Sequence, residues 1–191
     1  MRSFRQPSSA TVSDFLRRHG GQDFSYPDVG ASLNGSPSGF DVDHNEILLG
    51  KGRAVFEAAR AALKEWKMFP SGWTRVEPPG APVRVGGVVA VLFKVFGLWW
   101  LNVSRIVYIL DEERRFGFAY GTLPAHIESG EELFRVEWRA DDTVWYDIRG
   151  FSRPRFWMVR LGYPIARWLQ RRFVRDSKAA VRAAVGSPEP P

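Results

Sequence analysis

The hydrophobic pattern of this chain changes its period near Pro154, and that change constrains the fold more than any other feature. From residue 73 to residue 152, apolar and polar side chains alternate over short segments, which is typical of β-strands. Beyond Pro154, apolar residues recur every three or four positions, as they do on one face of an amphipathic helix. A sheet and a helix that each have one apolar face are most simply buried against each other.

Turn residues divide the alternating stretch into short strands, because Gly, Pro and Asp interrupt it repeatedly. The predicted strands cover residues 73–77, 83–93, 99–110, 116–123, 131–139 and 143–151. Their short connections predict an antiparallel meander. A further strand is expected at residues 40–49, ahead of an amphipathic helix at 53–67.

The expected fold class is therefore α+β, with a curved antiparallel sheet of about seven strands wrapped on a long C-terminal helix. The spacing of large side chains predicts the apolar stripe of that helix. This stripe consists of Met158, Leu161, Ile165, Trp168, Leu169 and Phe173, and is continued by Ala179, Ala180 and Ala183. Gly162-Tyr163-Pro164 predicts a kink or a break in the helix, because proline removes a backbone hydrogen bond.

The positions of the loops indicate how the chain divides into an extension, a domain and a tail. Residues 1–39 are expected to form an N-terminal extension, with a short helix at 11–18 capped by Thr11 and a loop rich in glycine, serine and proline. Residues 40–186 are expected to form the domain of sheet and helices, and 187–191 a disordered tail.

The net charge of the chain is +6, and the excess of basic residues lies in one element. Between residues 153 and 182 there are nine arginines and lysines and a single acid, Asp176. Clustered positive charge on a helix can bind phosphate groups, so an anionic partner at this helix is one hypothesis. The alternative is a solvated helix face whose arginines pair with nearby acids such as Asp176.

What the chain lacks disfavours several classes of protein. It has no cysteine, which excludes disulfides and thiolate metal sites and fits a reducing compartment. No apolar leader is visible at residues 1–10, and the longest uncharged apolar run, residues 85–93, is far shorter than the roughly 20 residues of a membrane-spanning helix. A cytoplasmic protein without a transmembrane segment is therefore expected.

The sequence comes closest to a functional site where the predicted strand 116–123 ends in a turn. His126 follows that turn, and Glu131 and Glu132 begin the next strand, so a histidine and carboxylates are available for general acid–base chemistry. These three residues are weak candidates for catalysis. The alternative is a hairpin tip with solvated glutamates.

Other residues are candidates for contact with a ligand on the concave face of the sheet, where aromatic side chains either fill the core or line a cavity. The candidates are Arg105, Tyr108, Phe118, Tyr120, His126, Tyr146 and Trp168. Arg105 shares a strand face with Leu101 and Val103, so an inward-pointing guanidinium would need a partner such as Glu132 or a ligand carboxylate. An arginine that reaches solvent at the strand edge is the alternative.

No cofactor or metal ion is expected. Gly50-Lys51-Gly52 precedes a helix, but it lacks the spacing of a Walker motif or of a dinucleotide-binding glycine motif. His19, His44 and His126 are far apart in the sequence, and no carboxylate ladder accompanies them.

Beyond these patterns, several short stretches resemble one protein family. They are Leu49-Gly50-Lys51-Gly52, Trp66-Lys67-Met68-Phe69, Arg105-Ile106-Val107-Tyr108, residues 116–123, His126, residues 130–134, Phe151-Ser152-Arg153-Pro154 and residues 170–173. Through them the chain resembles the family catalogued as domain of unknown function 1990 (UPF0548). The order of its elements is also similar to the helix-grip architecture of the START-like (SRPBCC) superfamily. The resemblance implies that fold and a ligand-binding role, and supplies no catalytic residues.

Three functions follow as hypotheses. The first is the binding of a small, largely apolar or amphipathic molecule between the sheet and the C-terminal helix. The second is an interaction module whose basic helix binds an acidic partner, nucleic acid or an anionic membrane surface. The third is a hydrolase- or lyase-like enzyme that uses His126 with Glu131 or Glu132.

Overall fold

The chain folds around one antiparallel sheet, in a computed structural model that describes residues 1–35, 37–70, 72–155 and 163–186. The described strands are β1 (Arg2–Ser3), β2 (Asp41–Lys51), β3 (Thr74–Glu77), β4 (Val88–Val95), β5 (Leu98–Asp111), β6 (Arg115–Thr122), β7 (Glu128–Trp138) and β8 (Thr143–Pro154). The described helices are α1 (Ser9–His19), a short 3-10 helix at Ala31–Leu33, α2 (Arg53–Lys64) and α4 (Tyr163–Val185).

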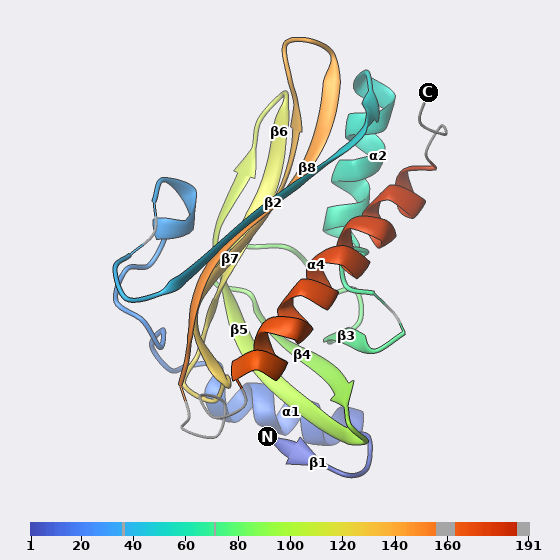
Figure 1. The fold of residues 1–191 in the computed structure, drawn as a ribbon. Coiled ribbons are helices and arrows are strands. Elements are labelled where there is room, and N and C mark those ends of the chain that lie inside the picture. Colours follow the sequence, from blue (N-terminus) through green and yellow to red (C-terminus); the bar gives the residue numbers. More distant parts are fainter. Residues whose placement is uncertain (36, 71, 156–162, 187–191) are drawn as a thin grey trace.

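The strands follow one another across the sheet in the order β2-β8-β7-β6-β5-β4-β3, and β1 pairs with β5 beyond the end of β6. The sheet curves around α2 and α4, which cover its concave face, while α1 packs on the opposite face (Figure 1). The predicted α+β helix-grip fold is therefore confirmed. Two-residue β1 was not predicted, because so short a strand leaves no alternation to detect.

Two strand boundaries differ from the prediction for local reasons. β4 begins at Val88 and not at residue 83, because Gly86, with a φ of 78°, turns the chain immediately before it. β7 begins at Glu128, three residues earlier than predicted, where it pairs with the end of β8.

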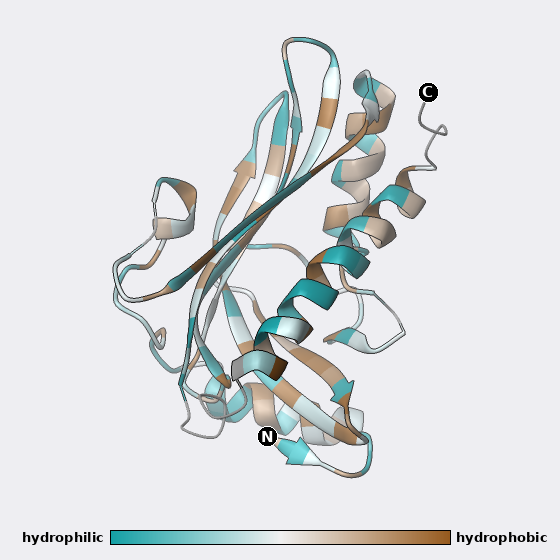
Figure 2. Cartoon of the chain, in the orientation of Figure 1, coloured by the Kyte–Doolittle hydropathy of each residue, from teal (hydrophilic) through white to brown (hydrophobic). Residues whose placement is uncertain are grey.

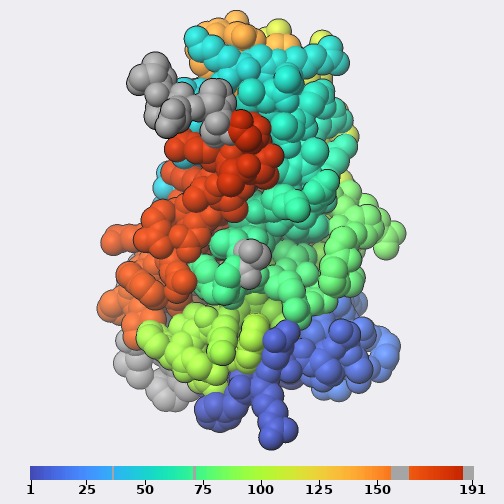
Figure 3. All heavy atoms as spheres, turned by 90° about the vertical axis from the view of Figure 1, so that its right-hand side faces the viewer, coloured from blue at the N-terminus to red at the C-terminus, as the bar shows by residue number. Residues whose placement is uncertain are grey.

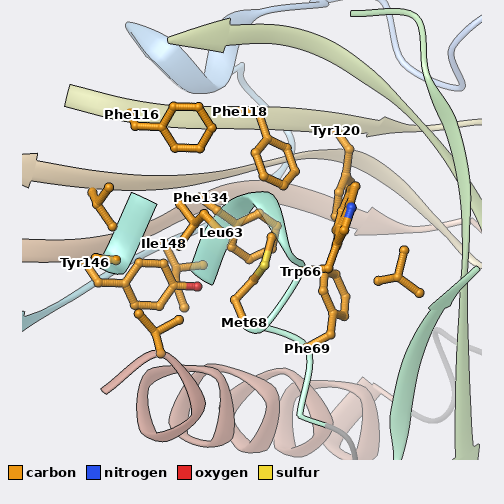
Figure 4. Close-up of a cluster of buried hydrophobic side chains, with 14 of the residues drawn as sticks. Leu63, Trp66, Met68, Phe69, Phe116, Phe118, Tyr120, Phe134, Tyr146 and Ile148 are labelled. Atoms are coloured by element: carbon orange, nitrogen blue, oxygen red, sulfur yellow. The ribbon is translucent and has the colours of Figure 1, made fainter. Parts of the chain in front are cut away.

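The core between the sheet and the helices is rich in aromatic side chains (Figure 4). Phe118 and Phe134 lie on neighbouring strands with their ring centroids 5.9 Å apart, and Phe69 lies 5.8 Å from Phe134. Phe56 and Leu63 of α2 are fully buried in the same cluster. This close packing fixes α2 against the sheet, because the apolar residues of α2 recur on one side.

The buried side of α4 differs from the predicted stripe. Ser177 and Val181 are fully buried, and Phe173 packs on the core beside them. Ile165 and Trp168, which the stripe was predicted to bury, are 48% and 54% exposed. The middle turns of α4 are largely hydrophilic (Figure 2), and the helix packs on the core mainly through its C-terminal half.

Part of the C-terminal prediction cannot be compared with the structure. α4 begins at Tyr163, so Pro164 lies in its first turn, where a missing backbone N–H costs little. Met158, Leu161 and Gly162 lie outside the described residues, as does the predicted tail at 187–191.

α1 buries the convex face of the sheet. Its N-cap is Ser8, whose Oγ accepts a hydrogen bond from the backbone N–H of Thr11 at 3.2 Å, so the predicted cap at Thr11 is wrong. Val12 and Phe15 pack in one cluster with Leu101 of β5. The N-terminal extension thus covers the sheet, and its separation from the domain at residue 39 stays a prediction.

We expect Phe134→Ala to lower the free energy of unfolding by about 3–5 kcal/mol, because it empties a fully buried site between Phe69 and Phe118. Urea unfolding followed by circular dichroism measures the change. The matched control is Phe96→Ala, whose ring is 77% exposed and whose loss should change stability by less than about 0.5 kcal/mol. Equal losses from the two substitutions would contradict this packing.

Candidate functional site

A cavity of about 870 Å³ lies between the concave face of the sheet and α4. Strands β2 to β8 contribute to its lining, α4 forms one wall, and the segment between α2 and β3 adds Phe69 and Trp73. Cavities that bind small molecules in proteins usually measure about 300–1,000 Å³. The size and position of this cavity make it the candidate site.

Much of the lining is apolar. Phe69 lies between Tyr120 and Phe173, with ring centroids 6.3 Å and 5.4 Å away. The aliphatic and aromatic lining is completed by Ile47, Val91, Phe93, Ile148, Leu169 and Val174. A surface of this kind favours an apolar molecule, because contact with it releases water from both.

Hydrogen-bonded carboxylates interrupt this apolar lining. Tyr120 Oη donates to Glu132 Oε2 at 2.7 Å. Gln170 Nε2, on α4, donates to Glu128 Oε1 and to Ser152 Oγ, each at 3.1 Å. The carboxylates of Glu128 and Glu132 therefore lie on the concave side of β7 with partners that leave further acceptor positions open.

Arg167 places a positive charge near these carboxylates. Its guanidinium donates to both carboxylate oxygens of Asp43, at 2.6 Å and 2.8 Å, and to Gln170 Oε1 at 2.8 Å. Arg167 and Gln170 thereby fasten the first half of α4 to β2, β7 and β8 through polar contacts.

Burial controls the protonation of Glu132. It raises the pKa of this carboxyl to about 7, the Tyr120 hydrogen bond lowers it in part, and the Glu128 and Asp43 carboxylates raise it further. Burial likewise raises the pKa of Glu128, although Gln170 and Arg167 oppose the rise. Near neutral pH Glu132 therefore exists in both forms, so it can either accept or donate a hydrogen bond.

His126 lies in the turn after β6 and borders the cavity. Its Nδ1 lies 3.0 Å from the backbone N of Glu128 and 3.1 Å from the backbone carbonyl oxygen of the same residue, so the backbone of Glu128 holds the ring at this nitrogen. Burial lowers the pKa of His126 to about 3. The ring is therefore neutral at physiological pH and offers one N–H donor.

The structure brings Tyr120, His126 and Glu132 together at the cavity, and their use as a functional site stays a prediction. Glu131 also borders the cavity, but its carboxylate lies on the convex side, because successive side chains of a strand point to opposite faces. There it accepts hydrogen bonds from Tyr26 Oη at 2.7 Å and from the backbone N–H groups of Gly30 and Ser32. Glu131 thus holds the N-terminal extension.

Arg105 also lies on the convex face. Its guanidinium donates to the backbone carbonyls of Gly20 and Gln22, at 2.7 Å and 2.6 Å, and does not pair with Glu132. Arg105 shares its strand face with Leu101 and Val103, as predicted, but α1 and not the cavity covers that face.

Tyr108 reaches the convex face because of a register shift. A bulge between Ile106 and Tyr108 breaks the alternation of β5, so Tyr108 pairs with Ala119 instead of following Ile106 onto the concave side. The hydroxyl groups of Tyr108 and Ser32 are hydrogen-bonded at 2.7 Å.

The remaining predicted contacts do not line the cavity. Phe118 and Tyr146 are fully buried in the core, where Tyr146 Oη and Ser177 Oγ are hydrogen-bonded at 2.9 Å. Trp168 is largely exposed on the surface of α4. A ligand-binding role for these three residues stays a prediction without support from their position.

Sequence reasoning missed Asp43 and Gln170. Asp43 carried a signal, since Asp41, Asp43 and Asn45 occupy alternate positions of β2 and share one face. Glu128 was predicted to belong to the group of carboxylates beside His126, but it lay before the predicted start of β7, so no face was assigned to it. Gln170 gave no signal of its own.

The basic residues of α4 mostly have partners within the protein. Arg172 lies over the ring of Trp73 at 4.6 Å and forms an ion pair with Asp176 at 3.4 Å. Arg175 pairs with the same carboxylate at 2.8 Å. These contacts neutralise part of the charge, and an anionic partner at α4 stays a prediction.

Two further properties concern only the described residues. They contain no group of three or more His, Cys, Asp or Glu side chains placed to hold a metal ion. None of their helices is long and apolar enough to cross a membrane.

We expect the Glu132 carboxyl to titrate near pH 7. Since its pKa in the folded protein lies above the ordinary 4.5, the folded state binds this proton more tightly than the unfolded state. The resulting stabilisation is complete below about pH 4.5 and is lost as the pH rises through about 7. Glu132→Gln should remove this dependence from urea unfolding curves measured across that range.

Carbon-13 NMR of the side-chain carboxyl groups measures the same titration directly. The spectrum of Glu132→Gln identifies the resonance by its absence. A Glu132 resonance that titrates at its ordinary pKa of 4.5 would contradict the buried environment described for it.

Comparison with known proteins agrees with this architecture. The model of the domain of unknown function DUF1990 matches residues 25–180. A UPF0548 protein of Dictyostelium discoideum is 35% identical over 206 residues, which cover 96% of this chain and 95% of the relative. A UPF0548 protein of Deinococcus radiodurans is 37% identical over 194 residues, covering 94% and 97%.

Solved structures share the fold at much lower identity. The hypothetical protein jhp0584 of Helicobacter pylori has a TM-score of 0.52 and 12% identity, over 86% of this chain and 95% of that one. The di-domain ARO/CYC StfQ from the steffimycin biosynthetic pathway has a TM-score of 0.50 and 9% identity, over 77% and 51%. Since the family model covers most of the chain and the relatives match it nearly end to end, the protein belongs to the DUF1990 (UPF0548) family.

Proposed function

We propose that this protein binds a small, largely apolar molecule that carries a polar group, in the cavity between the sheet and α4. The observation that carries the proposal is the lining of the cavity, which combines an extensive apolar surface with the hydrogen-bonding side chains of Tyr120, Glu132 and His126. This combination is typical of sites for small molecules, where apolar contact supplies affinity and a few polar groups fix orientation.

The apolar part of the ligand would contact the aromatic wall. Phe69 and Phe173 come from outside the sheet, so together with Tyr120 they surround a bound molecule from more than one side. Each Å² of apolar surface removed from water contributes about 25 cal/mol to binding. A molecule that fills much of the cavity would therefore bind without any charged group.

The polar group of the ligand would lie near Glu132. This carboxyl can donate or accept a hydrogen bond at neutral pH, and His126 presents a neutral imidazole ring at the edge of the cavity. The carboxylates of Asp43, Glu128 and Glu132 make the part of the cavity beside β7 unfavourable for an anion. The opposite wall, on α4, is basic, and its lining includes Arg171, Arg175, Lys178 and Arg182. Beside Glu132, a hydroxyl, a carbonyl or an amine of the ligand therefore fits better than a carboxylate.

Native mass spectrometry of freshly purified protein is the first test. Extra mass that disappears on denaturation would show a co-purified ligand and begin its identification. If the mass is bare, the neutral fluorescent probe N-phenyl-1-naphthylamine is added to the same protein, because its size and apolar rings suit the cavity.

We expect Leu169→Trp to weaken binding of this probe at least about tenfold, because the indole occupies space that the probe needs. Leu169 lines the cavity from α4. The matched control is Ile165→Trp, which adds the same ring one turn earlier, at a site 48% exposed. Equal binding by the two variants, or no saturable binding by the parent protein, would contradict the proposal.

Glu132 supports a second candidate function, which is proton transfer to or from the bound molecule. A carboxyl with a pKa of about 7 suits an acid–base catalyst near neutral pH, and Tyr120 orients it. The alternative use of Glu131 has no such support, because its carboxylate holds the N-terminal extension.

The test of this second function uses the ligand released from the native protein. Conversion of that ligand by the parent protein, and not by Glu132→Gln at equal occupancy, would support proton transfer. An unchanged ligand after prolonged incubation with the parent protein would contradict it, while leaving the binding function intact.

A further inference from the structure

The turn between β4 and β5 carries a second surface, which we call the hairpin tip and define as residues 94–100 together with residues 2–5. Phe96 is 77% exposed in that turn, and Phe4 is 86% exposed immediately after β1. The strand register brings them together. Ser3 pairs with Trp99 and Val95 pairs with Leu98, so the chain at Phe4 continues toward the turn that holds Phe96.

Two phenylalanine rings exposed at one end of a molecule are unusual, because large apolar side chains in water are normally scattered and partly covered. The tip is apolar beyond these two rings, since Leu98, Trp99 and Trp100 are only partly buried. Figure 3 shows the N-terminal residues and the β4–β5 hairpin side by side at the lower end of the molecule. The tip is therefore an apolar patch that the described part of the chain does not cover.

The charge of the hairpin tip is entirely positive. Arg2, Arg5 and Lys94 belong to it, and the sequence has no acidic residue at positions 1–13 or 78–110. Arg2 lies over the Trp100 ring at 5.8 Å, and Lys94 lies over the Trp99 ring at 5.7 Å.

Carboxylates on the adjoining elements do not offset this charge. Glu77 of β3 forms an ion pair with Arg75 at 2.6 Å, and Asp14 of α1 pairs with Arg17 at 2.7 Å. Each carboxylate is therefore balanced by its own arginine, and the positive field of the tip is left uncompensated.

Exposed aromatic rings among cations, without anions, match the chemistry of one particular partner. In an anionic bilayer, aromatic rings lie favourably at the level of the headgroups, and each nearby Lys or Arg is attracted to the negative surface. Long basic side chains can reach the phosphates while the rings beside them are buried. The pattern of the tip satisfies both requirements at once.

The tip is also continuous with the cavity. Phe93 lines the cavity, stacks on Trp100 with centroids 6.2 Å apart, and lies three residues before Phe96. A partner at the tip would therefore lie next to the rim of the cavity.

We propose that the hairpin tip docks this protein on an anionic phospholipid bilayer. Phe4 and Phe96 enter the headgroup region, and Arg2, Arg5 and Lys94 lie next to the lipid phosphates. This proposal does not depend on which molecule the cavity binds, or on whether it binds one.

Flotation with vesicles tests the proposal, using the full chain with any affinity tag at its C-terminal end. One set of vesicles contains phosphatidylcholine alone, and the other contains about one-third phosphatidylserine, a fraction that gives a strongly negative surface. The parent protein should float with the anionic vesicles, not with the neutral ones, and binding should weaken as salt rises from about 50 to about 200 mM.

Two pairs of variants separate the apolar contribution from the charge. Phe4→Ser with Phe96→Ser should weaken binding at least about tenfold, since the burial of two rings is lost. Its control is Val42→Ser with Leu48→Ser, which removes two exposed apolar side chains from β2 and should leave binding unchanged.

The charge variant, Arg5→Gln with Lys94→Gln, should also weaken binding to anionic vesicles. Its control, Lys51→Gln with Arg53→Gln, removes the same charge at the start of α2 and should bind like the parent protein. Thermal melting confirms that each variant is folded. Failure of the parent protein to bind anionic vesicles, equal binding to neutral vesicles, or undiminished binding by the phenylalanine variant would each overturn the proposal.

Discussion

The rest of the structure depends on the alternation of side chains along β7. The sheet is covered on both faces, so successive side chains of each strand pack into two different layers. Glu131 and Glu132 are neighbours in sequence but belong to different parts of the structure. A buried carboxylate needs hydrogen-bond donors, and the N-terminal extension supplies them to Glu131 through Tyr26, Gly30 and Ser32. Gly121 makes room for this contact, since a Cβ at that position would lie 2.0 Å from Tyr26 Oη.

On the other face, Glu132 has only Tyr120 as its described hydrogen-bond partner and borders open space.

The order of the elements could be predicted because each long element has a clear period and a clear boundary. The alternation between residues 73 and 152 predicted the meander, and the spacing of apolar residues predicted α2 and the C-terminal helix. The alternation could not show which side of each strand lies on the concave face of the sheet. Leu101, Val103 and Arg105 do share one face, but both faces of β5 are buried, so periodicity cannot say which one is concave. The bulge after Ile106 then reverses the alternation, and no glycine or proline marks its position in the sequence.

The candidate site was predicted in part, and the difference has a physical reason. Tyr120, His126 and Glu132 were found because β6, its turn and β7 are continuous in sequence, so local reasoning places them together. Asp43 and Gln170 reach the site from β2 and α4, at the opposite ends of the domain, and only the tertiary fold brings them there. Trp168 was misplaced because a stripe predicted from spacing assumes that the whole helix is packed, whereas the first turns of α4 border the cavity and solvent.

The two halves of α4 are held by different kinds of contact, and this has a mechanical consequence. Its C-terminal half is packed, with Ser177 and Val181 fully buried, whereas its first half is fastened by Arg167 and Gln170 through polar contacts that water or a ligand can replace. At 1.5 Å of rise per residue, about 15 Å of helix separates Arg167 from Ser177, so a tilt of about 4° about the packed end moves Arg167 by about 1 Å. The helix can therefore tilt about its packed C-terminal half, and its first half then moves the furthest. Moving the first half of α4 away from the sheet would widen the cavity by breaking exchangeable hydrogen bonds, while the packed core at the other end of the helix stays closed.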